Sequence, residues 1–386
     1  MRILFVYAGP FFGSAWAVCK HIIKGVDPAA FQIYIAANAQ SPGNFEIDAS
    51  RAVIRRLALR LEGGGARRVA AAATLGANVV RLAALVRREH IDLIHTNEDA
   101  NSALIGLALK ATTGRPLVVH YHTIPGLYGG ARRAVMKRIA RRADCNVGVS
   151  RFVAEEITKL GVPERRVAVA VNGVDVQRFN PGIDGSAVRR EYGVAGDEVL
   201  AVVLARVAQE KRQEDFIRAL AIARHAEPRL RGMIVGWDDP RYDGRFSSYR
   251  EELAGLAARE GVRDALVMDK ARNDAPLLHA AADLTVLPSP AEPFGLVVAE
   301  AMATGKPVIG ARAGGIPEII DDGVTGYLVP PRDPSALAEK LVELARDPEL
   351  RARMGRAGRE AACGRFSPAH VAAQFEAIYR RVAPRA

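Results

Sequence analysis

Two glutamates, Glu292 and Glu300, stand eight positions apart in the segment PSPAEPFGLVVAEAMATG, which runs from Pro288 to Gly305. A strand is predicted to end at Leu287, and after a short loop a helix is predicted to begin near Phe294. One carboxylate then lies in the loop and the other about two turns along the helix, so both can face the same side. Carboxylates in such positions accept hydrogen bonds from vicinal hydroxyls of a sugar or a ribose. A pair of glutamates on a solvent-exposed surface would have the same spacing.

The predicted start of this helix is a second chemical feature. Its backbone N–H groups and the positive end of its dipole point beyond the carboxyl end of the preceding strand. Open α/β sheets bind their ligands at that edge. The segment is therefore suited to a diphosphate.

The elements that must position this segment alternate between apolar strand-like runs and helical patterns, which favours parallel sheets of the α/β class. The predicted strands are Ile3–Tyr7, Ile33–Ala36, Leu93–His95, Leu117–His122, Cys145–Val149 and Val167–Val171, then Leu200–Leu204, Met233–Val235, Leu266–Met268, Leu284–Leu287, Pro307–Ile309 and Tyr327–Val329. Two Rossmann-like domains are expected in series, over residues 1–182 and 196–366, with a Pro- and Gly-containing linker between them. A break is expected at residues 360–365, before a helix over residues 368–382.

Length and composition agree with two soluble domains. The chain has 386 residues, 49% hydrophobic and 25% charged, and a chain of this length usually builds more than one core. We expect the opening residues 1–8 to be a buried strand rather than a signal peptide. The three cysteines, Cys19, Cys145 and Cys363, fit no disulfide framework and no metal-ligand spacing. A cytoplasmic location is expected.

The formal net charge is +11, which indicates an acidic partner such as nucleotide phosphates or an anionic membrane. Two stretches, residues 51–68 and 132–142, concentrate the basic side chains. Each is compatible with a solvated helix face or with a surface that docks at the inner face of a membrane. No motif of a nucleic-acid-binding module accompanies them, so no nucleic-acid partner is expected.

The segment around Glu292 and Glu300 resembles the donor-binding signature of glycosyltransferase family 4, whose members are retaining enzymes with the GT-B fold. The likeness continues through Gly314-Gly315-Ile316-Pro317-Glu318 and Asp322-Gly323-Val324-Thr325-Gly326, and earlier through Val171-Asn172-Gly173-Val174-Asp175. The resemblance implies two Rossmann-like domains that face a central cleft. It also implies that the C-terminal helix, residues 367–386, packs back on the N-terminal domain.

The resemblance assigns roles to the donor side. Arg206 and Lys211 would grip the donor phosphates and stabilise the departing diphosphate. Glu300 would hold the ribose hydroxyls, and Glu292 would hold the transferred sugar. The remaining donor-binding residues by resemblance are Gly13, Gly236, Phe294, Gly295, Leu296 and Val297. The chain departs from the family pattern where Ala205 and Arg212 replace two glycines and where Ser14 replaces a third.

On the N-terminal side, His122 resembles the active-site histidine of the family and would orient the transferred sugar. His120 lies deeper in the same strand and is the better structural candidate. His95, Asn97 and Glu98 end another strand, where they would contact the acceptor or cap a helix. The acceptor would be a small molecule or a lipid-linked one.

The implied reaction moves a hexose from a nucleoside diphosphate, UDP favoured and GDP second, to an acceptor hydroxyl with retention. A donor phosphate oxygen would take the acceptor proton, since no second carboxylate is placed as a nucleophile. No Asp-x-Asp motif is present near the site, so neither a metal ion nor another cofactor is expected. Three alternatives have similar features: a dinucleotide-dependent oxidoreductase, a sugar-nucleotide epimerase and a non-catalytic membrane-surface protein. The oxidoreductase would need a Gly-x-Gly-x-x-Gly motif after the first strand, and this chain does not have one there.

Overall fold

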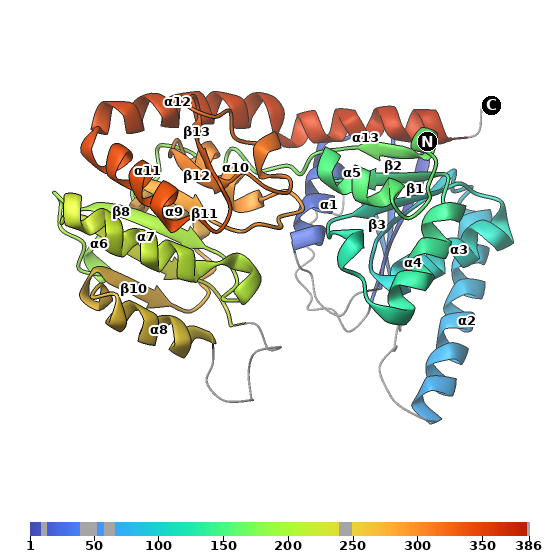
Figure 1. Cartoon of the computed structure of the whole chain (residues 1–386). Coiled ribbons are helices and arrows are strands. Elements are labelled where there is room, and N and C mark those ends of the chain that lie inside the picture. The colour runs from blue at the N-terminus through green and yellow to red at the C-terminus, as the bar shows by residue number, and fades with distance from the viewer. Residues whose placement is uncertain (9–13, 39–51, 58–65, 239–248, 384–386) are drawn as a thin grey trace. The chain divides into compact units, whose positions relative to one another are not determined.

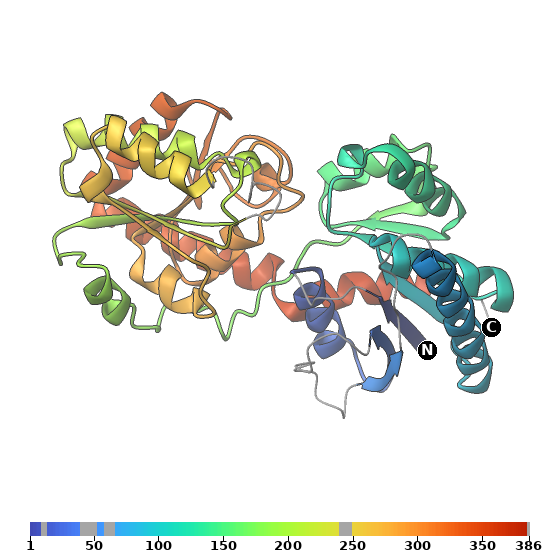
Figure 2. The ribbon, with the colours of Figure 1, turned by 90° about the horizontal axis from the view of Figure 1, so that it is seen from below.

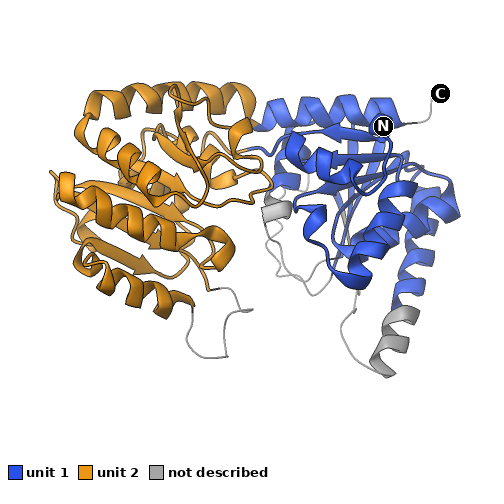
Figure 3. Cartoon of the chain, viewed as in Figure 1, with its two compact units in different colours: residues 1–173, 368–386 blue, residues 174–367 orange. Residues whose placement is uncertain are grey.

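The computed structural model describes residues 1–8, 14–38, 52–57, 66–238 and 249–383. The chain forms two compact units, shown in different colours in Figure 3. The first contains Met1–Gly173 together with Pro368–Ala386, and the second contains Val174–Ser367. In each unit helices lie on both faces of one parallel sheet, as Figures 1 and 2 show.

The first unit has a seven-stranded sheet of order β3-β2-β1-β4-β5-β6-β7. Its strands are β1 (Arg2–Tyr7), β2 (Gln32–Asn38), β3 (Ala52–Leu57), β4 (Leu93–Asn97), β5 (Leu117–Tyr121), β6 (Cys145–Gly148) and β7 (Val167–Val169). Its helices are α1 (Ser14–Gly25), α2 (Ala66–Arg88), α3 (Ala100–Thr113), α4 (Gly130–Arg142), α5 (Arg151–Thr158) and α13 (Pro368–Val382). The central strands are buried on both faces, in keeping with the apolar run ILFVY of β1, although β4 and β5 also bury polar residues such as His95 and His120.

The C-terminal helix α13 is part of the core of the first unit. Its buried side chains Val371, Phe375 and Tyr379 pack in the same cluster as Ile3 and Ile22. The approach to α1 is close, because a Cβ atom added at Gly25 would lie 2.6 Å from both the Ala372 Cβ and the Pro368 carbonyl oxygen.

The second unit has a six-stranded sheet of order β10-β9-β8-β11-β12-β13. Its strands are β8 (Val199–Leu204), β9 (Leu230–Val235), β10 (Leu266–Asp269), β11 (Leu284–Leu287), β12 (Val308–Ala311) and β13 (Gly326–Val329). Its helices are α6 (Ser186–Glu191), α7 (Gln213–Ala226), α8 (Tyr249–Arg259), α9 (Ala275–Ala281), α10 (Leu296–Ala303), α11 (Pro334–Arg346) and α12 (Pro348–Arg365), and η3 (Gln209–Lys211) is a short 3-10 turn.

The boundary between the units differs from the expected one at residue 182. Residues 174–182 belong to the second unit. Arg359 Nη1 donates to the carbonyl oxygens of Val176 and Phe179, at 3.0 and 2.8 Å, and the Val174 N–H donates to the Phe366 carbonyl oxygen at 2.8 Å. These bonds hold the segment on α12.

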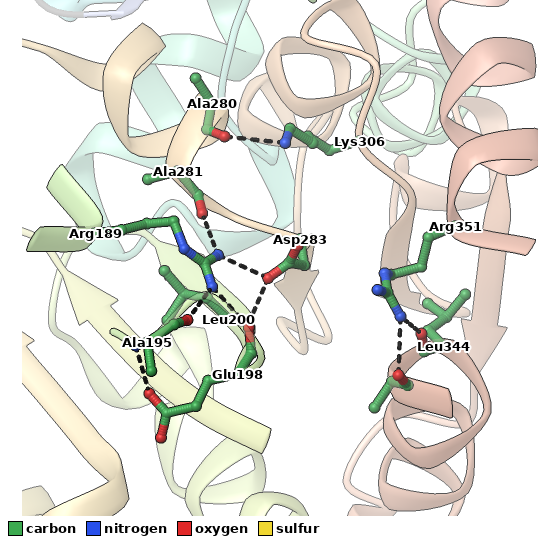
Figure 4. A network of polar contacts seen from close by, with 11 residues as sticks. Arg189, Ala195, Glu198, Leu200, Ala280, Ala281, Asp283, Lys306, Leu344 and Arg351 are labelled. Atoms are coloured by element: carbon green, nitrogen blue, oxygen red, sulfur yellow. Dashed lines mark hydrogen bonds and ion pairs between the residues drawn. The ribbon is translucent and has the colours of Figure 1, made fainter. Parts of the chain in front are cut away.

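The expected linker also contains structure, because residues 186–191 form α6. Figure 4 shows how its Arg189 is held: Nη1 lies 2.8 Å from Asp283 Oδ2 and 3.0 Å from the Ala281 carbonyl oxygen, while Nη2 donates to two further carbonyl oxygens. The same carboxylate accepts from the Leu200 N–H at 2.7 Å. One half-buried ion pair therefore fixes α6 to the sheet.

Two other expectations were wrong. Residues 360–365 do not form a break, since α12 continues to Arg365, and residues 51–68 are not one helix, since β3 occupies residues 52–57. In α12 the alanines around Gly358 and Gly364 favour helix strongly enough to offset the glycines. The strand β3 pairs with β2 along six positions. This pairing stabilises a strand although the sequence AVIRRL contains two arginines.

Candidate functional site

In the second unit, Lys211 and Glu292 form an ion pair at the carboxyl edge of the sheet. Lys211 ends η3, after β8, and Glu292 lies in the loop after β11. The Lys211 ammonium donates to Glu292 Oε1, and the two side chains are 17% and 9% exposed. The structure thus brings together two predicted residues that are 81 positions apart in the chain.

Arg206 follows β8 on the same edge and is also paired with a carboxylate. Its Nη2 lies 2.6 Å from Glu210 Oε1. Its guanidinium carbon lies 5.8 Å from the centre of the Trp237 ring, and Trp237 is 55% exposed. Both predicted phosphate-binding cations are therefore half-buried and balanced by glutamates. An anion of higher charge can compete with those glutamates for the cations.

Two buried side chains that the sequence analysis did not single out fix the backbone of this segment. Gln213 Nε2 donates to the Arg206 carbonyl oxygen at 2.8 Å, and Ser289 Oγ donates to the Glu210 carbonyl oxygen at 3.0 Å. Gln213 and Ser289 have no exposed surface. The sequence does not show whether a glutamine or a serine near a loop is buried. The positioning role of these two residues is therefore visible only in the packing.

Arg212, where the family pattern has glycine, has the left-handed backbone conformation with φ of 55°. Glycine adopts this conformation without cost, whereas other residues are strained by about 1 kcal/mol. The guanidinium turns to the first turn of α7, where it lies 2.9 and 2.7 Å from the oxygens of Asp215 and 2.5 Å from Glu214. The arginine, which directly precedes α7, thus compensates for the lost glycine by pairing with carboxylates in the first turn of that helix.

The N-terminus of α10 is formed by Gly295, whose φ is 105°. Among the described residues, none caps this helix start with a side-chain hydrogen bond. The preceding loop is held by two glycines: the Gly315 N–H donates to the Glu292 carbonyl oxygen at 2.8 Å, and a Cβ atom at Gly314 would lie 2.5 Å from that oxygen. Phe294 is buried, while Leu296 and Val297 are half-buried. The helix start remains available to an anion.

Glu300, on α10, faces His279 of α9. Its Oε2 lies 3.7 Å from His279 Nε2. His279 is fully buried, and its Nδ1 lies 3.4 Å from Thr285 Oγ1. His279 is a third residue that the sequence analysis missed, and it restricts where the Glu300 carboxylate can turn.

Gly236 directly follows β9, which pairs with β8. A Cβ atom at this position would lie 1.8 Å from the Ala205 carbonyl oxygen and 3.3 Å from the Arg206 nitrogen. Glycine is therefore needed because two backbones approach each other, directly beside Arg206.

In the first unit, His122 comes directly after β5. Its Nε2 lies 3.3 Å from Asn97 Oδ1, at the end of β4, and its ring centre lies 4.0 Å from that of His120. Burial lowers the pKa of His122 to about 3, so the imidazole is neutral at physiological pH. A neutral ring can donate one hydrogen bond and accept another.

His95 lies in the core, contrary to the expectation that it contacts an acceptor. It has no exposed surface, its Nδ1 lies 2.7 Å from the Tyr379 hydroxyl, and its ring stacks on Phe5 with centres 4.4 Å apart. Glu98 is also buried, and burial raises its pKa to about 7. Gly13 lies outside the described residues.

The basic stretch at residues 132–142 is part of α4. Its six arginines and lysines are all exposed, while Met136 and Ile139 are buried. Most of the stretch at residues 51–68 lies outside the residues whose side chains are described. Over the described parts of the chain, no helix has both the length and the apolar character needed to cross a bilayer.

Two family models match the chain almost end to end. Residues 18–178 match the model described as Glycosyltransferase Family 4, and residues 186–361 match the model described as Glycosyl transferases group 1. The first matched range lies in the first unit except for its last five residues, and the second matched range lies entirely in the second unit.

Curated relatives and a solved structure show the same likeness. An N-acetyl-alpha-D-glucosaminyl L-malate synthase of Bacillus anthracis is 30% identical over 306 residues, which are 78% of this chain and 77% of the relative. A D-inositol 3-phosphate glycosyltransferase of Streptomyces avermitilis is 33% identical over 292 residues, which are 72% of this chain and 63% of that relative. The structure of Anabaena Alr3699/HepE in complex with UDP and glucose superimposes with a TM-score of 0.82 at 25% identity, over 99% of this chain and 100% of the other.

Proposed function

This chain belongs to glycosyltransferase family 4 and has the GT-B fold, and we propose that it is a retaining, metal-independent enzyme that transfers a hexose from a nucleoside diphosphate to an acceptor hydroxyl. The observation that carries the proposal is the pair of Lys211 and Glu292 beside the uncapped start of α10. The cation contacts a carboxylate that lies three positions before Gly295, and among the described residues no side chain caps the N–H groups of this helix start. A sugar diphosphate presents the two kinds of group that such a segment can bind, an anion and hydroxyls.

In this proposal the diphosphate displaces the two glutamates from their cations. Arg206 and Lys211 turn from Glu210 and Glu292 to the phosphate oxygens, because a diphosphate carries more charge than one carboxylate. Both cations are half-buried, so their attraction to the leaving group is weakened less by solvent than at an open surface. The N–H groups of Gly295, Leu296 and Val297 add to the stabilisation of the leaving group.

Glu292, once released, accepts hydrogen bonds from hydroxyls of the transferred sugar, with Phe294 closing the same loop. Glu300 accepts from the ribose hydroxyls, and His279 limits its movement. Gly236 lets the end of β9 approach β8, which fixes the backbone of Arg206. Gly13 is assigned to donor binding by resemblance alone.

We assign to His122 the orientation of the transferred sugar. A neutral imidazole can donate a hydrogen bond to a sugar hydroxyl without adding a charge. The proton of the acceptor hydroxyl passes to a donor phosphate oxygen, and the new glycosidic bond forms on the face from which the diphosphate departs. No metal ion takes part, since Arg206, Lys211 and the helix start supply the positive charge.

UDP is the donor nucleotide that we favour, with GDP second. The structure of the Anabaena protein, which contains UDP and glucose, supports this preference. Asn97 and Glu98 are assigned to the acceptor, which we expect to be a small molecule or a lipid-linked one.

The exposed basic face of α4 favours a second role. Its six cations are exposed, and the helix contains no acidic residue to balance them. We propose that this face makes a peripheral contact with anionic lipid at the cytoplasmic side of a membrane. Sedimentation with vesicles that contain an anionic lipid tests the contact. Binding that is unchanged in neutral vesicles, or unchanged after Lys137→Glu and Arg138→Glu, would exclude it.

The proposed transfer is tested first by thermal unfolding of the chain with UDP, GDP, ADP or NAD, each with EDTA present. A ligand at 100 times its dissociation constant adds about 2.7 kcal/mol of stability. We expect UDP to raise the unfolding temperature of the wild type and of Glu339→Gln, which alters an exposed glutamate on α11. We expect little shift in Glu300→Gln.

Other outcomes point elsewhere. A shift with NAD alone would favour an oxidoreductase, and the absence of any shift would favour the non-catalytic alternative. Where UDP binds, proton NMR of the product formed from an α-linked UDP-hexose reads the anomeric configuration. A β-linked product would refute retention, and loss of turnover in EDTA that Mg²⁺ restores would refute metal independence.

A further inference from the structure

Three side chains from separate parts of the first unit converge near His122. Cys19 lies on α1, His120 lies on β5, and His122 follows β5. Each offers one ligand atom, a thiol sulfur or a ring nitrogen, and these atoms lie within 4.8 Å of one another. No spacing in the sequence shows the cluster, because about a hundred residues separate the cysteine from the histidines.

His120 is the second observation that points to a ligand. It has no exposed surface, and neither of its ring nitrogens has a hydrogen-bond partner among the described residues. His122 Nδ1 is buried without a partner in the same way. Buried polar atoms in folded proteins nearly always have a partner. The His120 ring cannot easily turn away to find one, since Phe375 packs against it with ring centres 4.9 Å apart.

We propose that Cys19, His120 and His122 form a zinc-binding site. Zn²⁺ binds readily to sulfur and nitrogen ligands, such as a thiolate and two imidazoles. Mg²⁺, Ca²⁺ and Mn²⁺ prefer oxygen ligands. The thiol gives up its proton when the metal binds. At Zn–S and Zn–N lengths of about 2.3 and 2.1 Å, tetrahedral ligand atoms lie roughly 3.5 Å apart. Side-chain shifts of about 1 Å thus close the site.

Asn97 provides a candidate for the fourth position. Its Oδ1 lies 3.5 Å from Cys19 Sγ and 3.3 Å from His122 Nε2. The amide oxygen therefore already stands beside two of the three ligands. His122 is the half-buried member of the cluster, while Cys19 and His120 are buried, so a metal ion would enter past His122.

Zinc at this site would inhibit the enzyme. This consequence rests on the proposed function, in which His122 orients the transferred sugar. A ring nitrogen that binds a metal can no longer make a hydrogen bond, and the bound ion fixes the ring in place. Zn²⁺ would act as an inhibitor of a reaction that itself needs no metal.

Metal binding is tested without any need for activity, by titrating the full chain with Co²⁺ as a spectroscopic substitute for Zn²⁺. The wild type should show a thiolate-to-cobalt charge-transfer band and intense tetrahedral d–d bands at one equivalent, and Zn²⁺ should remove both. Cys19→Ser should lose the charge-transfer band. Cys363→Ser, a matched change at the half-buried cysteine of α12, should keep it.

Circular dichroism of the metal-free variants shows whether each is folded. If Cys19→Ser does not fold, His122→Gln carries the test, because it changes the half-buried ligand and should weaken Co²⁺ binding at least tenfold. The absence of a charge-transfer band in the wild type would overturn the proposal. So would a band that survives in Cys19→Ser and disappears in Cys363→Ser.

The inhibition is measured separately, as sugar transfer from UDP-hexose in the presence of Zn²⁺ or EDTA. We expect Zn²⁺ to lower the rate at least tenfold in the wild type and EDTA to restore it, while Cys19→Ser stays within twofold. A cobalt spectrum without any transferase activity would leave the metal site established and refute the proposed function. Inhibition of equal size in Cys19→Ser would refute the regulatory role.

Discussion

Gly236→Ala should disturb Arg206 through the backbone, without changing any charge. The added Cβ would lie 1.8 Å from the Ala205 carbonyl oxygen, whereas ordinary contact begins at 3.4 Å. The ends of β8 and β9 must therefore separate by about 1.6 Å. The φ of Gly236 is not positive, so crowding is the only obstacle to alanine at this position.

The cost follows from the bonds that hold those ends together. The Ala205 N–H donates to the Val235 carbonyl oxygen at 3.1 Å, and the Val207 N–H donates to the Trp237 carbonyl oxygen at 3.0 Å. Weakening both costs about 1 kcal/mol each, and overpacking adds about 1 kcal/mol or more. A loss of about 3 kcal/mol lowers the unfolding temperature of a unit of this size by roughly 6–12 °C.

Donor binding should fall as well, because a displacement of about 1 Å at a positioned group can cost about a hundredfold in rate. The assay combines unfolding in urea with UDP titration and transferase rates. Gly255→Ala on α8 is the matched control: among the described residues, its added Cβ would contact only the Arg259 side chain, at 3.4 Å. That variant should be as stable as the wild type or slightly more so. Wild-type stability and UDP affinity in Gly236→Ala would refute the steric argument.

Three further changes have defined outcomes. Lys211→Met leaves the 9%-exposed Glu292 carboxylate without its cation and should cost about 3 kcal/mol, while the double variant with Glu292→Gln should recover most of that loss; urea unfolding without ligand decides, and equal stabilities would show that the pair contributes nothing. Ser289→Ala removes the bond that fixes the Glu210 carbonyl oxygen and should raise the KM for the donor several-fold with a smaller change in kcat, so an unchanged KM would remove its positioning role. Tyr379→Phe leaves His95 Nδ1 unpartnered in the core and should cost about 1–3 kcal/mol, which calorimetry would contradict if the unfolding temperature stayed the same.

Much of the local structure follows from the sequence. Of the observed strands, β11 was predicted with its bounds, and helix α13 was predicted over residues 368–382. The strand is a short apolar run between Asp283 and Pro288, and the helix has a strong apolar periodicity and begins at Pro368. β3 was missed because its sequence AVIRRL contains adjacent arginines, and strand formation there depends on pairing with β2. The helix α6 was missed because its six residues have too little periodicity of their own and depend on the ion pair with Asp283.

The candidate site divides in the same way. The motif around Glu292 and Glu300 was visible because its residues are close in the chain and their spacing reflects a loop followed by a helix. The sequence did not identify the partners that hold this motif, which are Gln213, Ser289 and His279. A polar residue gives no sign in the sequence of whether it is buried or exposed. His95 was misplaced for that reason: the sequence shows that it ends a strand, and only α13 makes it a core residue.

The sequence by itself determined the family, the parallel α/β architecture and the charged residues of the donor segment, because those properties depend on neighbours within about twenty positions. Tertiary structure alone decided which glutamate balances which cation, why Gly236 must be glycine, and that Cys19 meets His120 and His122. Each of these facts depends on a distance between residues that are far apart in the chain. Hydrogen bonds, ion pairs and metal coordination act over a few ångströms, so the fold must first bring such residues together.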